Sequence, residues 1–145
     1  MRAVIDNNIW ISALLRPAGP PGQVYTAFRQ GRITLVTSEP LLAELETVLG
    51  RAKFGRRGVT PEMTAEMLDL LRTTAELVSI AGDLNLCRDP KDDMVIETAL
   101  AGGAEVLVSR DEDLTRALEV ADYLIPSGIR ILTVRRFLQL LEEGS

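Results

Sequence analysis

The stretch Arg2-Ala3-Val4-Ile5-Asp6-Asn7-Asn8 decides the fold class, because it joins a short apolar strand to a polar turn that opens a helix. The same kind of join recurs along the chain. Further expected strands cover residues 33–36, 77–80, 105–108 and 129–132. Expected helices between and after them cover residues 9–15, 23–30, 39–49, 61–74, 90–101, 111–120 and 134–141. This alternation predicts an α/β fold in which a central parallel sheet is flanked by helices on both faces, and we expect a single domain spanning residues 1–145.

Composition excludes several kinds of site. The chain has no histidine, which removes serine-histidine-aspartate catalysis, cysteine-histidine catalysis and histidine-ligated zinc. The single cysteine, Cys87, excludes an intramolecular disulfide and a cysteine-rich zinc site, and its apolar neighbours favour a core position. Carboxylates, hydroxyls, arginines and lysines remain, and oxygen ligands suit hard cations such as Mg²⁺ or Mn²⁺.

Hydropathy and charge bear on location and partners. No apolar run reaches the roughly 20 residues that a membrane span requires. Asp6 interrupts the first apolar run, so the N-terminus lacks the organisation of a signal peptide. We therefore expect a cytoplasmic protein that does not bind membranes. The net charge of −5 argues against a general nucleic-acid coat protein, but not against a nuclease with an acidic site.

Four acidic residues lie at or just beyond the expected strand ends: Asp6, Glu44, Asp92 and Asp111. The carboxyl ends of parallel strands share one edge of a sheet, where such folds bind ligands. Carboxylates gathered there repel one another unless a cation lies between them. The four acids therefore predict a divalent-metal site and phosphodiester chemistry. We expect Asp6, Asp92 and Asp111 to be metal ligands and Glu44 to orient the attacking water.

Three of these acids also have simpler explanations. Asp6 and Asp111 each precede an expected helix, and either carboxylate is suited to cap that helix. Glu44 flanks an apolar helical arc, where a solvated carboxylate is common. Ser109 and Asp113 flank Asp111. Ser109 is suited to hydrogen-bond a phosphate or to orient Asp111, and Asp113 is suited to act as a secondary metal ligand. The residues alone therefore leave open whether these acids form a metal site or act separately as helix caps and solvated carboxylates.

Asp92 lies in a strong helix start, Asp89-Pro90-Lys91-Asp92. Its carboxylate completes a capping box with Asp89, or else it faces the core. At about 100° per residue, Asp92 projects into the middle of an apolar arc and Asp93 lies at the edge of that arc. The arc is formed by Val95, Ile96, Ala99 and Leu100. A carboxylate on a buried face needs a partner or a metal.

A basic segment lies between Gly50 and Gly58 and holds Arg51, Lys53, Arg56 and Arg57 without any acid. The glycines predict a loop, and the charges are suited to follow an RNA phosphate backbone. A solvated loop, or a surface for an acidic partner chain, is the alternative.

Four blocks, taken in order, resemble PIN domains over nearly the whole chain, and more narrowly the bacterial toxin components related to VapC-type ribonucleases. The first block is Val4-Ile5-Asp6-Asn7-Asn8-Ile9-Trp10-Ile11-Ser12-Ala13-Leu14, and the second is Ser38-Glu39-Pro40-Leu41-Leu42-Ala43-Glu44-Leu45. The third is Arg88-Asp89-Pro90-Lys91-Asp92-Asp93 followed by Ala99-Leu100-Ala101-Gly102-Gly103-Ala104. The fourth is Val108-Ser109-Arg110-Asp111-Glu112-Asp113-Leu114.

This resemblance implies a single PIN-like domain whose metal-site acids fall on Asp6, Glu44, Asp92 and Asp111. The helper positions of the family fall on Asn8 and Ser109, and Asp93 and Asp113 are further supporting acids. Asn7 and Ser109 stand where the family more often has Thr, and neither change removes a carboxylate. The implied function is Mg²⁺- or Mn²⁺-dependent cleavage of RNA by a toxin that forms a homodimer and is restrained by a cognate antitoxin.

Two rival functions remain. An aspartate phosphotransferase of the haloacid dehalogenase kind needs a second aspartate where Asn8 stands. One of the response-regulator kind needs a phosphate-contacting lysine after a late strand, and no lysine is well placed there. A catalytically inactive PIN-fold module that binds RNA or protein is the stronger rival. Apolar residues from Ile9 to Leu15, together with the helix that begins at Pro61, provide more apolar surface than a small sheet needs, which also favours a homodimer.

Overall fold

The structure is a computed structural model that describes residues 1–85, 90–110 and 124–144. Within this part of the chain, five parallel strands form one sheet in the order β3-β2-β1-β4-β5. The strands are β1 (Arg2–Ile5), β2 (Thr34–Thr37), β3 (Glu76–Leu77), β4 (Val106–Ser109) and β5 (Arg130–Thr133). The α/β fold with a central parallel sheet, expected from the alternation of strands and helices, is confirmed.

Helices follow the strands in sequence and cover both faces of the sheet. They are α1 (Asn7–Leu15), α2 (Pro20–Arg29), α3 (Glu39–Leu49), α4 (Ala52–Arg56), α5 (Pro61–Thr74), α6 (Pro90–Ala101), the 3₁₀ turn η2 (Ile125–Ser127) and α8 (Val134–Glu143). Pro20, Pro40 and Pro61 lie in the first turns of their helices, where the missing N–H costs nothing.

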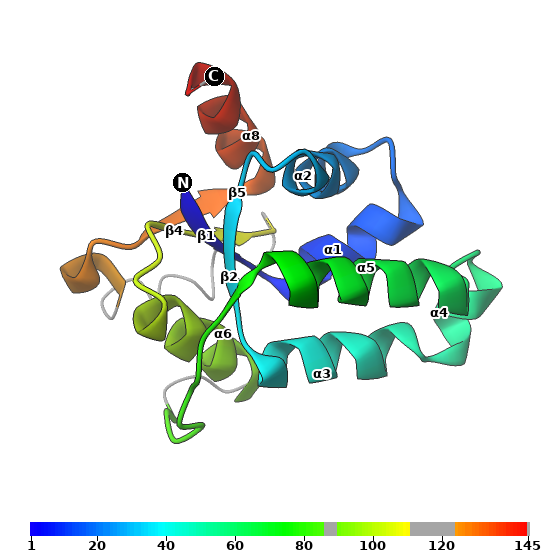
Figure 1. The fold of residues 1–145 in the computed structure, drawn as a ribbon, viewed down its shortest axis with the longest axis horizontal. Coiled ribbons are helices and arrows are strands. Elements are labelled where there is room, and N and C mark those ends of the chain that lie inside the picture. Colours follow the sequence, from blue (N-terminus) through cyan, green and yellow to red (C-terminus); the bar gives the residue numbers. More distant parts are fainter. Residues whose placement is uncertain (86–89, 111–123, 145) are drawn as a thin grey trace.

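Alternation along β1 explains why the chain has two apolar cores. Ala3 and Ile5 face the larger core, which α1, α2, α3, α5 and α8 cover. Val4 points to the other face and packs with Ile96 and Ala99 of α6. Successive side chains of a strand point to opposite faces, so a strand buried on both sides is apolar at every position. Figure 1 shows α6 on one side of the sheet and α1, α2 and α5 on the other.

The N-terminal apolar segment is used inside a single chain. Trp10 is 3% exposed, and its ring meets Tyr25 edge-on and Phe28 at a tilt, with ring centroids 6.1 Å and 5.8 Å away. Ile9 and Leu14 are also buried, as are Met67, Leu68 and Leu71 of α5. The single chain therefore buries most of the apolar residues on which the homodimer was predicted, and the homodimer stays a prediction.

One local prediction needs correction, and two concern residues that the structure does not describe. The basic segment is not a loop, because it contains the short helix α4, which Phe54 anchors by burying its ring. Ser38, which precedes α3, is buried, and its Oγ pairs with Thr98 Oγ1 at 2.9 Å. Cys87 and the helix expected over 111–120 lie outside the described residues.

Helix length bears on membrane crossing. Within the described ranges, no helix is both long and apolar enough to cross a membrane.

Candidate active site

Strand register brings Asp6 and Ser109 to the same level at the carboxyl edge of the sheet. Ile5 pairs with Val108 in neighbouring parallel strands, and the Asp6 N–H donates to the Val108 carbonyl at 3.0 Å. Ser109, which is 7% exposed, is the last residue of β4. The chain therefore leaves the sheet at two adjacent points, and Asp6 stands at one of them.

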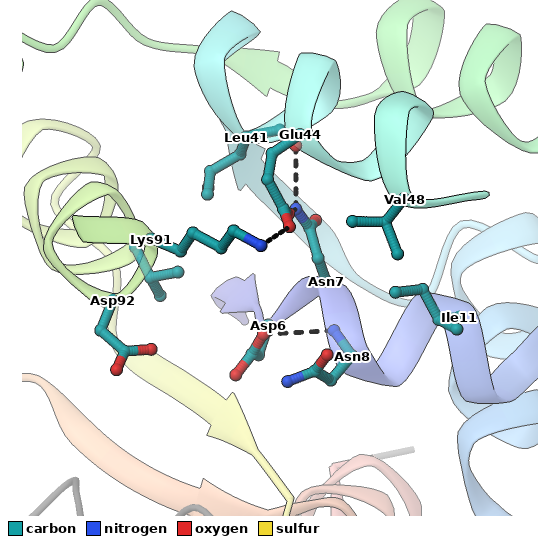
Figure 2. A pocket seen from close by; sticks show the side chains of 10 residues that line it. Asp6, Asn7, Asn8, Ile11, Leu41, Glu44, Val48, Lys91 and Asp92 are labelled. Atoms are coloured by element: carbon teal, nitrogen blue, oxygen red, sulfur yellow. Dashed lines mark hydrogen bonds and ion pairs between the residues drawn. The ribbon is translucent and has the colours of Figure 1, made fainter. Parts of the chain in front are cut away.

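A pocket lies at this edge and is lined by Asp6, Glu44 and Asp92 (Figure 2). Asn7, Asn8 and Lys91 add polar groups, while Ile11, Leu41, Val48 and Val95 form the apolar part of the wall. Its cavity volume is about 140 Å³, below the roughly 300–1,000 Å³ of sites that enclose a small molecule. The pocket is therefore of a size for an ion, its waters and one phosphate group.

Glu44 is fixed by two donors. The Asn7 side-chain amide donates to Glu44 Oε2 at 2.5 Å and to the Leu41 carbonyl at 2.8 Å. Lys91 Nζ lies 3.3 Å from Glu44 Oε1. The Glu44 side chain is 18% exposed, so this charge is partly removed from water and benefits from both donors. Figure 2 shows these contacts between α3, α1 and the start of α6.

Asp6 is both a helix cap and a pocket residue. Its Oδ1 accepts the Asn8 N–H at 3.2 Å, as expected for the N-cap of α1. The same carboxylate lines the pocket beside the Asn8 side chain, and Figure 2 shows Asp6, Asn8 and Asp92 pointing in the same general direction. Asp6 therefore caps α1 and lines the pocket with one carboxylate.

The helical-wheel prediction for α6 was wrong about which aspartate is buried. Asp93 is 4% exposed, whereas Asp92 is half-buried and lines the pocket. The wheel treated the apolar arc as the only buried surface. Asp93 instead enters a buried position beside that arc, and Asp92 faces the opening between α6 and α1.

The other predicted site residues are either outside the described residues or absent from the lining of the acidic pocket. Asp111 and Asp113 fall outside the described residues. Arg51, Lys53, Arg56 and Arg57 are exposed, and none of them lines the acidic pocket.

The carboxylates of the pocket are oxygen donors of the kind that bind divalent ions. Among residues 1–85, 90–110 and 124–144, no three acidic side chains lie close enough together to hold a metal. Asp6 and Asp92 nevertheless present carboxylates to one pocket, and such oxygen donors suit Mg²⁺ or Mn²⁺ better than softer metals. By ligand type, the Asp6 and Asp92 carboxylates would suit a hard cation in this pocket.

Sequence reasoning missed the parts played by Asn7 and Lys91. Asn7 was noted only for standing where the resembled family more often has Thr. Asn7 follows Asp6 at the start of α1, which packs on α3. That position could have indicated a contact between Asn7 and α3. Lys91 precedes Asp92 by one residue, and only the packing of α6 against α3 shows that it reaches Glu44.

Fold and pocket together define an α/β domain with a carboxylate pocket at the carboxyl edge of a parallel sheet. Residues 2–113 match the sequence profile of the PIN domain, and the chain belongs to the PIN domain family. PIN domains are generally nucleases that use divalent metals.

A relative from an archaeon extends the likeness over nearly the whole chain. An uncharacterized protein of Methanocaldococcus jannaschii is 25% identical over 145 residues, which cover 99% of this chain and 93% of that protein. No solved structure matches the chain significantly.

Proposed function

We propose that the chain is a Mg²⁺- or Mn²⁺-dependent endoribonuclease that cleaves RNA phosphodiester bonds at the acidic pocket. The observation that carries the proposal is that Asp6, Glu44 and Asp92, which are distant in sequence, line one pocket at the sheet edge. Asp111 is proposed as a further ligand, because it lies two residues after Ser109, which is level with Asp6.

The residues of the pocket have separate roles in this proposal. Asp6 and Asp92 hold the cation and Glu44 accepts a hydrogen bond from the attacking water. A bound divalent ion supplies a water of low pKa and positive charge against the phosphate. Asn7 and Lys91 keep the Glu44 carboxylate in one orientation, so that little reorganisation is needed when the substrate enters.

Several finer points rest on the resemblance to toxin components. It supports RNA as the substrate, a homodimer, and restraint by a cognate antitoxin. Growth arrest on expression of the parent chain, and not of an Asp92→Asn chain, is the result expected for a toxin. A mass equal to one chain in light scattering at micromolar concentration would contradict the homodimer.

Cleavage of an end-labelled RNA tests the nuclease proposal with one matched pair of variants. The parent chain should cleave the RNA in the presence of Mn²⁺ or Mg²⁺, and cleavage should stop when EDTA is added. Glu44→Gln should cut much more slowly, whereas Glu46→Gln should cut like the parent. Glu46 lies on the same helix, pairs with Arg72 at 3.6 Å and does not line the pocket. Equal rates for the two variants would contradict the role of Glu44.

A further inference from the structure

A second pocket, at the C-terminal end of α1, is basic. Arg16, Arg57 and Arg110 line it together with Ser12, and no acidic residue is among the described residues of its wall. Its cavity volume of about 450 Å³ is within the roughly 300–1,000 Å³ typical of ligand sites. Three arginines line one hollow even though the chain carries a net charge of −5.

The backbone at two of these arginines is well anchored. Arg16 ends α1, where its N–H donates to the Ser12 carbonyl at 2.8 Å and its carbonyl accepts the Gly19 N–H at 3.0 Å. Arg57 ends α4, and its N–H donates to the carbonyl of Phe54 at 3.0 Å. Phe54 itself is buried in the core. Anchored backbones present the side chains with a smaller loss of entropy when a ligand binds.

Charge and donor geometry indicate an anion. The N-terminus of α2 also faces this pocket through Gly19, Pro20 and Pro21, and its dipole adds positive potential. Pro20 and Pro21 have no N–H, so the arginines must donate the hydrogen bonds. An arginine fork matches phosphate oxygens two at a time.

Two elements connect the basic pocket to the acidic pocket. Helix α1 places Asn8 at the acidic pocket and Arg16 at the basic pocket, eight residues later, which is about 12 Å along a helix. Strand β4 ends at Ser109, level with Asp6, and Arg110 follows at once. A strand of nucleic acid whose reacting phosphate lies at Asp6 can thus reach the arginines with a neighbouring phosphate.

We propose that Arg16, Arg57 and Arg110 form a phosphate subsite that binds the RNA backbone next to the cleaved bond. This inference rests on the proposed nuclease function, because the acidic pocket sets where the cleaved phosphate lies. Of the four basic residues that the sequence suggested for RNA binding, only Arg57 belongs to this subsite. Arg16 and Arg110 are additional residues that the sequence did not indicate. A neighbouring acidic pocket favours a nucleic-acid strand over an acidic polypeptide as the occupant.

Equilibrium binding of RNA tests the subsite without requiring cleavage. The full-length chain carries Asp6→Asn to prevent hydrolysis, and fluorescence anisotropy follows a short, labelled single-stranded RNA. Arg16→Gln and Arg57→Gln should each weaken binding about tenfold, as expected for loss of a charged hydrogen bond. Each should also reduce the slope of log affinity against log salt by about 0.7.

Arg29→Gln is the matched control, since Arg29 lies at the far end of α2 from the pocket and stacks on Tyr25. It should bind RNA like its parent. The subsite would be overturned if Arg29→Gln lost as much RNA affinity as Arg16→Gln or Arg57→Gln. It would also be overturned if the Arg16→Gln/Arg57→Gln double variant kept the affinity and the salt slope of its parent. Poly-glutamate is then added as a competitor of the RNA. If its binding depends on Arg16 and Arg57 as strongly as RNA binding does, the RNA subsite is overturned and the pocket is assigned to an acidic polypeptide.

Kinetics separate failure of the subsite from failure of the nuclease. With Asp6 intact, the double arginine variant should raise KM for RNA and leave kcat close to the parent value. Cleavage with unchanged KM would reject the subsite alone. Absence of cleavage by the parent, combined with arginine-dependent RNA binding, would reject the nuclease and keep the subsite.

Discussion

The Asn7 side-chain amide donates to Glu44 Oε2 at 2.5 Å and thereby ties the first turn of α1 to α3. Asn7 is 8% exposed, and the same amide also donates to the Leu41 carbonyl. A threonine at this position would offer one hydroxyl on a shorter side chain. Asn7, which stands where PIN domains more often have Thr, therefore holds the Glu44 carboxylate of the pocket in place.

Loss of that support should cost both stability and activity. Asn7→Ala removes two hydrogen bonds, one of them to a partly buried charge, so the free energy of unfolding should fall by about 1–3 kcal/mol. RNA cleavage should slow because Glu44 loses its orientation. Urea unfolding and a cleavage assay measure the two effects, with the exposed residue change Asn85→Ala as control. An unchanged unfolding midpoint would contradict the role given to Asn7.

Removal of the Lys91 charge should strengthen metal binding. Lys91 Nζ lies 3.3 Å from Glu44, and its side chain is 49% exposed, so Lys91→Gln should change stability by less than about 1 kcal/mol. The pocket becomes more negative and should attract Mn²⁺ more strongly. Thermal unfolding at increasing Mn²⁺ reports the affinity. Lys53→Gln removes the same charge on α4, outside the acidic pocket, and a similar gain there would reject this explanation.

A pH-dependent contact should act at the other end of the sheet. Arg2 Nη1 lies 2.6 Å from Glu76 Oε2, and its hydrogen bond lowers the pKa of Glu76 below the ordinary value of 4.5. The folded state then holds this proton less tightly than the unfolded state, so the contact stabilises above pH 4.5 and is lost as the pH falls below it. Glu76→Gln should be less stable than the parent at pH 7 and should approach it in acid, as measured by urea unfolding. A constant difference across this range would contradict the contact.

A methyl group at Gly102 should destabilise the packing of α6 against β2. An added Cβ would lie 2.2 Å from Val36 Cγ1, which is buried. Gly102→Ala should therefore lower the free energy of unfolding by about 1–3 kcal/mol. Gly55→Ala on α4 meets nothing within 4 Å and should leave stability unchanged or raise it. Equal urea midpoints for Gly102→Ala and the parent would show that Val36 moves aside freely.

The parallel sheet and the position of Asp6 followed from the sequence because strand ends are local features. Val4 and Ile5 form an apolar strand wherever it pairs, and the residue after it must lie at the sheet edge. Burial of Asp93 could not be predicted in this way, because the wheel of a single helix contains no information about the neighbouring helices.

The basic pocket was beyond sequence reasoning for a similar reason. Arg16, Arg57 and Arg110 come from three separate parts of the chain, and only tertiary packing brings them together. The cluster of charges from Arg51 to Arg57 drew attention to one of them. Its glycines predicted a loop, but burial of the Phe54 ring supports a short helix.

Cleavage of RNA in Mn²⁺ by the parent, Asp6→Asn and Asp69→Asn tests the central claim most directly. Asparagine caps a helix as well as aspartate does, so Asp6→Asn should keep the parent unfolding midpoint. It should nevertheless cut RNA about a hundredfold more slowly or worse. Asp69→Asn, an exposed change on α5, should cut at the parent rate. A folded Asp6→Asn chain that cuts RNA as fast as the parent would contradict the assignment of the acidic pocket as the active site.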